Sequence, residues 1–401
     1  MAISDSQATA DKAHRQDAFD AVSEADLRAA GSLKWSAFPG QLPAWVAEMD
    51  FGLAAPITER LLELVSTAQV GYLPSHLVDE LGLACRDFLA MRHGWDVPAE
   101  WIRPVVDVLT ALEATVRHFT PAKGRIVVPT PAYMPFIMLP AMYGRELVQV
   151  PMIRDEASWE LDFAALGEAM TAGDLLVLCN PHNPIGKVYT REELLRLSSV
   201  VEACGARVFS DEIHAPLVYD GARHVPYASV SDAAARHTVT ATSASKAWNL
   251  AGLKAAQIIF SNAADYELWV AEEPFAEHGA STFGVAANIA AYTQGMPWLE
   301  GVIGYLDRNR RLLGRLLQER LPQARFVVPE GTYLAFVDCT ELDFGDFTGT
   351  PTEFFAAHAR VALTEGGLCG DVGAGWVRLN FATPAPILHR IVEHMAASLA
   401  K

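Results

Sequence analysis

A lysine follows two small hydroxyl residues in the string Ser243-Ala-Ser-Lys246, at the end of a short apolar run. A lysine at a strand end, held in a cleft with cationic neighbours, can have a lowered pKa and form an imine with an aldehyde. Ser243, Ser245 and Lys254 offer hydroxyls and a positive charge, a set that suits a phosphate. A lone lysine is more often a solvated surface residue, but the whole string favours a reactive amine beside a phosphate site.

Three more polar residues follow apolar runs elsewhere in the chain. Asp211 ends one run, and a buried carboxylate stays charged only beside a cation such as a protonated pyridine nitrogen. Such an acid also keeps the ring a good electron sink; the alternative is an aspartate that caps a helix. His214 and Asn183 can each contact an oxygen on the same ring. The alternatives are a packed histidine and an ordinary Asn-Pro turn.

Tyr133 and Arg378 complete the set of candidate residues. Tyr133 lies between two prolines and can stack on a flat heteroaromatic ring, although such a tyrosine is also common in a core. Arg378 lies in the apolar run Gly375-Trp-Val-Arg-Leu-Asn380, where a guanidinium needs an anionic partner. A substrate carboxylate suits its bidentate geometry, and a structural salt bridge is the alternative.

The elements that must position these residues alternate along the middle of the chain. Short apolar runs at 124–128, 174–179, 206–209 and 237–241 are separated by stretches of helix length, which predicts a mainly parallel buried sheet. Ligands collect outside the carboxyl ends of such strands, so four polar clusters should meet in one cleft. Helical spacing recurs at 57–92, with a break at 71–74, and a long helix is predicted at 305–321. The segment from Trp35 to Phe51 reads as too irregular for a regular element, and the first thirty residues as a mobile lead or a peripheral helix.

Composition excludes several classes of function. The 401 residues carry 31 Lys plus Arg against 48 Asp plus Glu, and the net charge of −17 disfavours nucleic acid and anionic membranes as partners. Five scattered cysteines, without a C-x-x-C pair, predict reduced thiols in a cytosol and no zinc or other metal site. No export signal or membrane-spanning run is evident, so we expect a cytoplasmic protein.

With these motifs in view, the sequence resembles the fold-type I pyridoxal-phosphate enzymes, and within them the cystathionine β-lyase (C–S lyase) branch of MalY and PatB. The resemblance runs from about Leu33 to Met395. Its motifs are Trp45-Val-Ala-Glu-Met-Asp-Phe51, Gly71-Tyr-Leu73, Pro129-Thr-Pro-Ala-Tyr-Met-Pro-Phe136, Asn180-Pro-His-Asn-Pro-Ile-Gly186, Ser210-Asp-Glu-Ile-His214, the run from Ser243 to Leu253, Pro329-Glu-Gly-Thr-Tyr-Leu-Ala335 and Val377-Arg-Leu-Asn380.

The resemblance implies the α/β aspartate aminotransferase fold, with a mainly parallel seven-stranded sheet in a large domain and a smaller α+β domain. Residues 1–56 would contribute to the small domain, 57–297 would form the large pyridoxal-phosphate domain, and 298–401 the small one. It also implies a homodimer whose active sites lie at the interface.

The resemblance assigns a role to each site residue. Lys246 would hold pyridoxal 5′-phosphate as an imine, with Asp211 at the pyridine nitrogen. The other cofactor contacts would come from Asn183, Tyr133 and His214 at the ring, and from Ser243, Ser245, Lys254, the amides of Val108 and Leu109, and the neighbouring subunit's copy of Tyr72 at the phosphate. Tyr72 also counts as a catalytic residue. Arg378 would bind the substrate carboxylate, with Asn183 and Trp45 beside it.

Three features depart from the family pattern. Asp107 stands where a glycine is common, so its carboxylate must turn away from the phosphate to cap the helix. Glu48 replaces an aspartate, and the loop Gly367-Leu-Cys-Gly370 is altered; we expect both at the substrate end.

The activity that the resemblance implies is β-elimination from cystathionine or another cysteine S-conjugate, which yields a thiol, pyruvate and ammonia. Two alternatives remain. An aminotransferase would use the same residues, whereas a regulatory protein that binds a transcription activator would not need them for catalysis.

Overall fold

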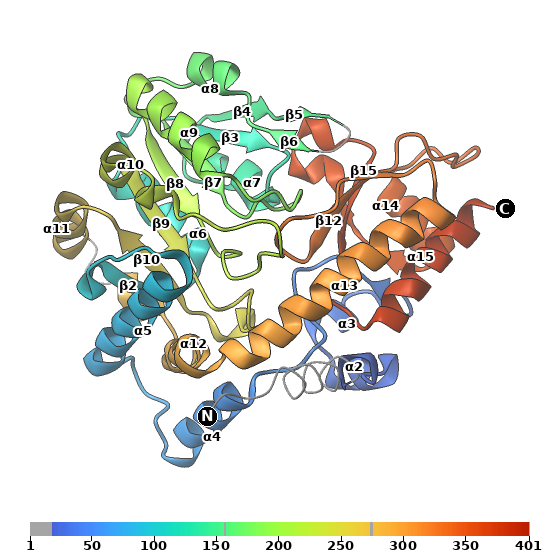
Figure 1. Cartoon of the computed structure of the whole chain (residues 1–401), viewed down its shortest axis with the longest axis horizontal. Helices are drawn as coiled ribbons and strands as arrows, with labels where there is room; N and C mark the ends of the chain where they lie inside the picture. Colours follow the sequence, from blue (N-terminus) through green and yellow to red (C-terminus); the bar gives the residue numbers. More distant parts are fainter. Residues whose placement is uncertain (1–17, 156–157, 273–275, 401) are drawn as a thin grey trace.

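A seven-stranded sheet forms the centre of the protein (Figure 1), whose computed structural model describes residues 18–155, 158–272 and 276–400. The strand order is β2-β10-β9-β8-β7-β3-β4. In chain order, the bounds are β2 Ile102–Val105, β3 Ile126–Thr130, β4 Leu147–Pro151, β7 Leu175–Cys179, β8 Arg207–Asp211, β9 Thr238–Thr242 and β10 Ala256–Phe260. The four strands expected from the apolar runs are β3, β7, β8 and β9.

Strand direction brings the carboxyl ends of six strands to one edge of this sheet. β4, β3, β7, β8 and β9 pair in parallel, and β10 is antiparallel to both β9 and β2. Two successive reversals make β2 run the same way as β9. The carboxyl ends of β2, β3, β4, β7, β8 and β9 therefore lie at one edge, and the prediction of a mainly parallel seven-stranded sheet is confirmed.

Side chains that alternate along the strands bury both faces of the sheet. Leu175 and Val177 of β7 pack with α6, α7 and α11, whereas Leu176 and Leu178 pack with α8 and α9 on the opposite face. α5 and α12 cover the end near β2 and β10. The helix bounds are α5 Ser75–His93, α6 Val108–His118, α7 Met134–Met142, α8 Phe163–Ala169, α9 Arg191–Cys204, α10 Asp232–His237, α11 Ala263–Glu272 and α12 Thr282–Gln294.

A smaller unit is built around the four-stranded sheet β11-β12-β15-β14. Its strands are β11 Arg325–Phe326, β12 Leu334–Asp338, β14 Thr364–Glu365 and β15 Trp376–Asn380, and its helices are α13 Met296–Arg320, α14 Pro351–Phe354 and α15 Ala385–Leu399. α13 contains the helix predicted at 305–321. β1 (Leu42–Pro43) pairs with β13 (Val361–Ala362), so the N-terminal segment lies with the C-terminal unit. Two further short strands, β5 Ile153–Arg154 and β6 Trp159–Glu160, form a hairpin. The predicted domain boundaries remain a prediction.

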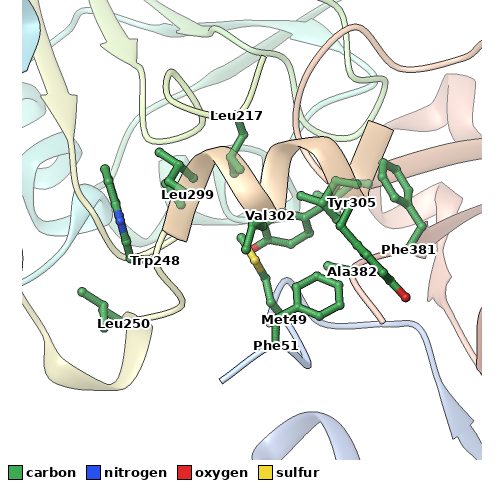
Figure 2. Packing of buried hydrophobic residues seen from close by; sticks show 14 of the residues in the cluster. Met49, Phe51, Leu217, Trp248, Leu250, Leu299, Val302, Tyr305, Phe381 and Ala382 are labelled. Carbon is green, nitrogen blue, oxygen red and sulfur yellow. The ribbon is translucent and has the colours of Figure 1, made fainter. Parts of the chain in front are cut away.

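One apolar cluster joins the two units (Figure 2). Leu299, Val302 and Tyr305 of α13 lie between Trp248 of the large sheet's loops and Phe51 of the N-terminal segment. The rings of Phe51 and Tyr305 meet edge to face at 5.1 Å between centroids. The position of the N-terminal segment is therefore set by both units at once.

The N-terminal half differs from expectation in two places. α4 (Ala55–Ser66) buries Ile57 and Leu64, but Leu62 and Val65, which belong to the helical spacing of apolar residues at 57–92, are 64% and 60% exposed. The segment expected to be irregular contains part of α3 (Leu33–Ser36), where Trp35 is buried and donates to Asp50, and all of β1, which forms by pairing with β13. α2 (Glu24–Ala30) buries no residue and is the expected peripheral helix; residues 1–17 lie outside the described residues.

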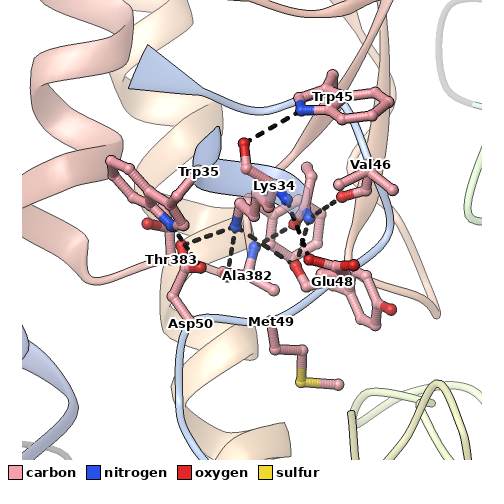
Figure 3. A network of polar contacts seen from close by, with 12 residues as sticks. Lys34, Trp35, Trp45, Val46, Glu48, Met49, Asp50, Ala382 and Thr383 are labelled. Carbon is pink, nitrogen blue, oxygen red and sulfur yellow. Dashed lines mark hydrogen bonds and ion pairs between the residues drawn. The ribbon is translucent and has the colours of Figure 1, made fainter. Parts of the chain in front are cut away.

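Residues 45–50, which we call the strap, are held by a buried ion pair (Figure 3). Lys34 Nζ lies 2.7 Å from Asp50 Oδ2 and also donates to the carbonyls of Glu48 and Ala382. Trp35 Nε1 donates to the other oxygen of Asp50 at 2.8 Å. Both charged side chains are almost completely buried, so each depends on the other for compensation.

Lys34→Met should lower the free energy of unfolding by about 3 kcal/mol, because it leaves the Asp50 carboxylate buried without its cation. Chemical denaturation measures the change, with exposed Lys123→Met as the matched control. The double variant Lys34→Met/Asp50→Leu should recover part of the loss. A single variant as stable as the parent would show that the pair does not hold the strap.

Candidate active site

A cavity of about 590 Å³ lies where this edge of the large sheet faces the small unit. Three parts of the chain line it: the strand ends, the strap and the small unit. From the strand ends come Val106, Asp107, Val108, Leu109, Tyr133, Met134, Asn183, Asp211, Ile213, His214, Ser245, Lys246, Ala251, Lys254, Ala255 and Ala256; from the strap Trp45, Val46 and Ala47; and from the small unit Thr352, Leu363, Thr364, Glu365, Leu368 and Arg378.

Lys246 lies in the turn that follows β9 and reaches the centre of the cavity lining. Burial and the nearby Arg378 lower the pKa of its amine to about 8, against the partial opposition of Asp211. Nζ donates to the Ala47 carbonyl at 3.3 Å. Near neutral pH the neutral form of Lys246, which a nucleophilic amine requires, is therefore more populated than in an ordinary lysine.

Asp211 is the last residue of β8 and is 4% exposed. Burial raises the pKa of its carboxyl to about 7, although the Ile213 amide donates to Oδ1 at 3.0 Å and Lys246 opposes the rise. No helix begins at this position in the described residues, so the helix-cap alternative is not supported. The site instead holds an acid that becomes a stable anion when a cationic ligand group lies beside it.

His214, Asn183 and Tyr133 line the same cavity. Burial, with the charge of Lys246, lowers the pKa of His214 to about 3, so its ring is neutral; its buried Nδ1 has no partner among the described residues. Asn183 Oδ1 accepts from Arg378 Nη1 at 3.2 Å, which leaves its amide NH₂ facing the other way. Burial raises the pKa of Tyr133, so its hydroxyl stays protonated at the start of α7.

Arg378 is a buried guanidinium with neutral partners. Nη2 donates to the Trp45 carbonyl at 3.0 Å and to Thr364 Oγ1 at 3.3 Å, and Nε has no partner. Burial lowers the pKa of this arginine, and no carboxylate in the described part of the chain lies within ion-pair distance. The structural salt bridge is therefore not found there. A cation this deeply buried calls for an anion from a ligand.

The opposite end of the cavity holds the start of α6. Val108 and Leu109 are its first residues, whose amides have no acceptor within the helix. Asp107 turns to cap the helix, as its position required: Oδ1 accepts from the Thr110 amide at 2.9 Å, and Oδ2 lies 3.0 Å from Lys254 Nζ. The carboxylate charge is thus offset, and this end can accept an anion.

Three predicted residues lie outside the cavity lining of this chain; for Tyr72 the predicted contact is with the neighbouring subunit's phosphate, and it stays a prediction. Ser243 does not line the cavity, because its hydroxyl donates to the Ala255 carbonyl at 2.7 Å and accepts from the Ser245 amide at 3.0 Å. Tyr72 is 95% exposed and also lies outside the lining. Glu48 does not line it either and accepts from the Lys34 amide. Of the altered loop 367–370, Leu368 does line the cavity.

A backbone carbonyl and a tyrosine of the site were not predicted from the sequence. Ala47 O accepts from both Lys246 Nζ and Tyr333 Oη, the latter at 2.9 Å. Tyr333 belongs to the recognised string 329–335 but was given no role. No motif marks a backbone carbonyl, so Ala47 had no sequence signal.

The arrangement fits one kind of ligand. A reactive amine, a buried acid and a neutral histidine surround the centre, a helix start with Lys254 and Ser245 lies at one end, and Arg378 lies at the other. A flat heteroaromatic aldehyde with a phosphate, bound beside an amino-acid carboxylate, satisfies all of these groups.

The sequence profile of aminotransferases of class I and II matches residues 54–395. The chain belongs to the aminotransferase class I and II family. Within this family, the cystathionine beta-lyase of Corynebacterium glutamicum is 36% identical over 382 residues, which span 93% of this chain and 98% of that protein.

Solved structures agree with this assignment. A chain from Corynebacterium diphtheriae is 39% identical with a TM-score of 0.89, and the alignment covers 95% of this chain and 98% of that one. The PLP-bound C-S lyase from Staphylococcus hominis is 28% identical with a TM-score of 0.88, covering 96% and 99%. The predicted family and fold are confirmed. Among the described helices, none combines the length and the apolar character that a bilayer crossing requires.

Asp211→Asn should stabilise the cofactor-free chain near neutral pH by roughly 1–3 kcal/mol. The folded-state pKa is raised from 3.8 to about 7, so the folded chain binds this proton more tightly than the unfolded chain. The wild type therefore loses stability as pH rises through this window, and the variant does not. Chemical denaturation at about pH 5 and about pH 8 should show a difference that grows with pH. Exposed Asp343→Asn is the control, since Asp343 also accepts the amide two residues ahead; equal behaviour of the two variants would contradict the prediction.

Proposed function

We propose that this protein is a pyridoxal 5′-phosphate-dependent carbon–sulfur β-lyase that cleaves L-cystathionine or related cysteine S-conjugates to a thiol, pyruvate and ammonia. The observation that carries the proposal is the meeting of Lys246, Asp211 and the unpaired Arg378 in one cavity. Relatives named cystathionine beta-lyase or C-S lyase support the choice of reaction.

The residues that line the cavity suit this cofactor. Asp211 would hold the protonated ring nitrogen, and this contact would satisfy the buried carboxylate whose pKa is raised in the chain alone. Tyr133 would stack on the ring, with Asn183 and His214 near the ring oxygen. The amides of Val108 and Leu109, with Ser245 and Lys254, would hold the phosphate. When bound, the cofactor supplies an electron sink for the pair released from the substrate's Cα–H bond.

The chain's own residues bind the substrate and move its protons. Arg378 binds the α-carboxylate, which brings the α-carbon near Lys246 Nζ. The neutral amine takes the α-proton and becomes an ammonium, which Ala47 O holds in place. The C–S bond then breaks with its electron pair on sulfur, and Lys246 returns the proton to the thiolate. The remaining aminoacrylate is hydrolysed by water to pyruvate and ammonia.

Lys246→Ala should reduce turnover by at least about a thousandfold and abolish the visible absorption band of the bound cofactor that borohydride removes. The parent protein should release pyruvate and free thiol from L-cystathionine without any added keto acid, and Lys246→Ala should not. Exposed Lys123→Ala is the matched control and should behave as the parent does.

The same assay separates the alternatives. Amino transfer that requires a keto acid, with no thiol released, would assign an aminotransferase and overturn the lyase. A protein that releases no product from any S-conjugate, and whose regulatory effect survives Lys246→Ala, would be a binding protein instead.

We further propose a cytoplasmic homodimer with shared active sites. Four apolar side chains on and after α4 are exposed in a single chain: Leu62, Val65, Val70 and Tyr72. The helix α4 itself lies at the periphery of the molecule (Figure 1). Exposed apolar patches of this kind mark association surfaces. The scattered cysteines support the cytosol as the compartment.

Val65→Glu should shift the protein from dimer to monomer in sedimentation velocity and lower cofactor retention, because a charge enters the proposed interface and Tyr72 of the neighbouring subunit is withdrawn. Leu195→Glu, an equally apolar exposed position on α9, should leave the dimer intact. A parent protein that sediments as a monomer at all concentrations would refute the shared site.

A further inference from the structure

The carbonyl of Ala47 is one acceptor with two donors that differ in permanence. Lys246 Nζ donates to it at 3.3 Å and Tyr333 Oη at 2.9 Å. A carbonyl oxygen has two lone pairs, so it can accept from both donors at once. Lys246 must leave this carbonyl whenever its amine engages the cofactor's aldehyde. Tyr333 is therefore the donor that stays with Ala47 throughout the proposed reaction.

Tyr333 is a donor that keeps its proton. Its side chain is 1% exposed and lies outside the cavity lining, with the edge of its ring against His214 at 5.9 Å between centroids. Burial raises the pKa of its phenol well above the ordinary value, although Arg378 opposes the rise. The hydroxyl thus neither touches a ligand in the cavity nor exchanges a proton with it. Tyr333 can act on the cavity only through the carbonyl that it holds.

The backbone just before Tyr333 adopts a strained conformation. Thr332 has a φ of +64°, in the left-handed region that a β-branched residue rarely enters. Its amide donates to Leu217 O at 2.8 Å, its carbonyl accepts from Tyr219 Oη, and its hydroxyl accepts from the Leu334 amide at 3.1 Å. Strain of this kind persists only where surrounding contacts impose it, and it gathers at functional sites. Here it fixes the direction in which the next side chain, that of Tyr333, leaves the backbone.

The strap on either side of Ala47 is also fixed by a side chain. Val46 O and Glu48 O both accept from Asn380 Nδ2, at 2.6 and 2.7 Å. The carbonyl between them has Tyr333 as its lasting donor. Because a displacement of about 1 Å at a reacting group can cost a large factor in rate, the orientation of this one carbonyl matters.

Several charges already act on the amine that Ala47 O contacts. Burial and Arg378 lower the pKa of Lys246, Asp211 and Glu48 oppose this, and Lys254 adds to the lowering. A hydrogen bond to the charged form favours that form. The strap carbonyl therefore supports the ammonium in surroundings that otherwise disfavour it.

We propose that Tyr333 is a positioning residue, which holds Ala47 O at the point where Lys246 becomes an ammonium as it takes the substrate's α-proton. The inference rests on the proposed lyase function and adds to it a residue from outside the cavity lining. Because the hydroxyl acts on the ammonium and not on the bound substrate, its loss slows proton transfer and leaves substrate binding nearly unchanged.

Tyr333→Phe removes the hydroxyl and keeps the ring. In the holoenzyme, kcat for L-cystathionine should fall about tenfold, KM should stay within about twofold, and the isotope effect on kcat with α-deuterated substrate should rise. Tyr292→Phe is the matched control, since it also removes a buried hydroxyl, which donates to Gln257 Oε1 at 2.7 Å, and it should change none of the three. A loss confined to KM, or an unchanged isotope effect, would overturn the role of Tyr333.

The cofactor-free chain gives a readout that does not depend on turnover. The rate at which acetic anhydride labels Lys246, followed against pH by peptide mass spectrometry, reports the pKa of its amine. Tyr333→Phe should lower this pKa by about 0.5 or more, because the ammonium loses its positioned acceptor. Tyr292→Phe should leave it unchanged. A pKa that rises in Tyr333→Phe would show that the hydroxyl only competes for the carbonyl, and one that does not move would show a purely structural role; either contradicts the proposal.

Failure of the lyase and failure of the positioning role are distinguishable. A parent holoenzyme that releases no pyruvate from L-cystathionine would overturn the lyase, whereas the labelling experiment still decides whether Tyr333 holds the acceptor of Lys246. Should Tyr333→Phe fail to fold, Thr332→Gly relaxes the backbone that directs the ring and must lower the same pKa. An unchanged pKa in that variant refutes the inference.

Discussion

The carbonyl groups of the strap are the constraint on which the site depends. Residues 45–50 have no sheet or helix to satisfy their backbone, so side chains from elsewhere must do so. Arg378 donates to Trp45 O, Lys246 to Ala47 O, and Asn249 to Met49 O. Each donor is thereby held in position as it satisfies the strap. The buried pair of Lys34 and Asp50 fixes the strap itself, so an ion pair outside the cavity sets the position of groups within it.

The buried charged groups that line the cavity lower the stability of the folded chain. Lys246 and Arg378 are buried cations close enough for one to lower the pKa of the other, and Asp211 is a buried acid whose pKa is raised. These groups are unfavourable in an isolated chain because burial removes water from charges. The same imbalance gives a ligand with complementary charges a large favourable interaction. Affinity for the ligand and the cost of folding the site thus have a common origin.

Much of the centre of the site could be predicted from sequence, because parallel strands end at one edge and short polar clusters follow each apolar run. Lys246, Asp211 and Asn183 were found in this way. The periphery could not be predicted. Ser243 and Ser245 look alike in sequence, yet one hydroxyl is used by a backbone carbonyl. Apolar spacing in α4 cannot tell a side chain buried in the core from an exposed one such as Val65. Whether such a side chain is buried depends on tertiary contacts or on a subunit interface, which the spacing of apolar residues does not reveal.

The ion pair of Asp107 and Lys254 makes anion binding at the start of α6 an exchange of partners. A phosphate that enters this end meets an ammonium already engaged by a carboxylate at 3.0 Å. Its gain is the difference between two ion pairs, so it is smaller than the attraction of a free lysine. When the phosphate leaves, Asp107 and Lys254 can pair with each other again, so neither charge remains uncompensated. The empty site is therefore stable, and Asp107 lowers the affinity of this end of the cavity for phosphate.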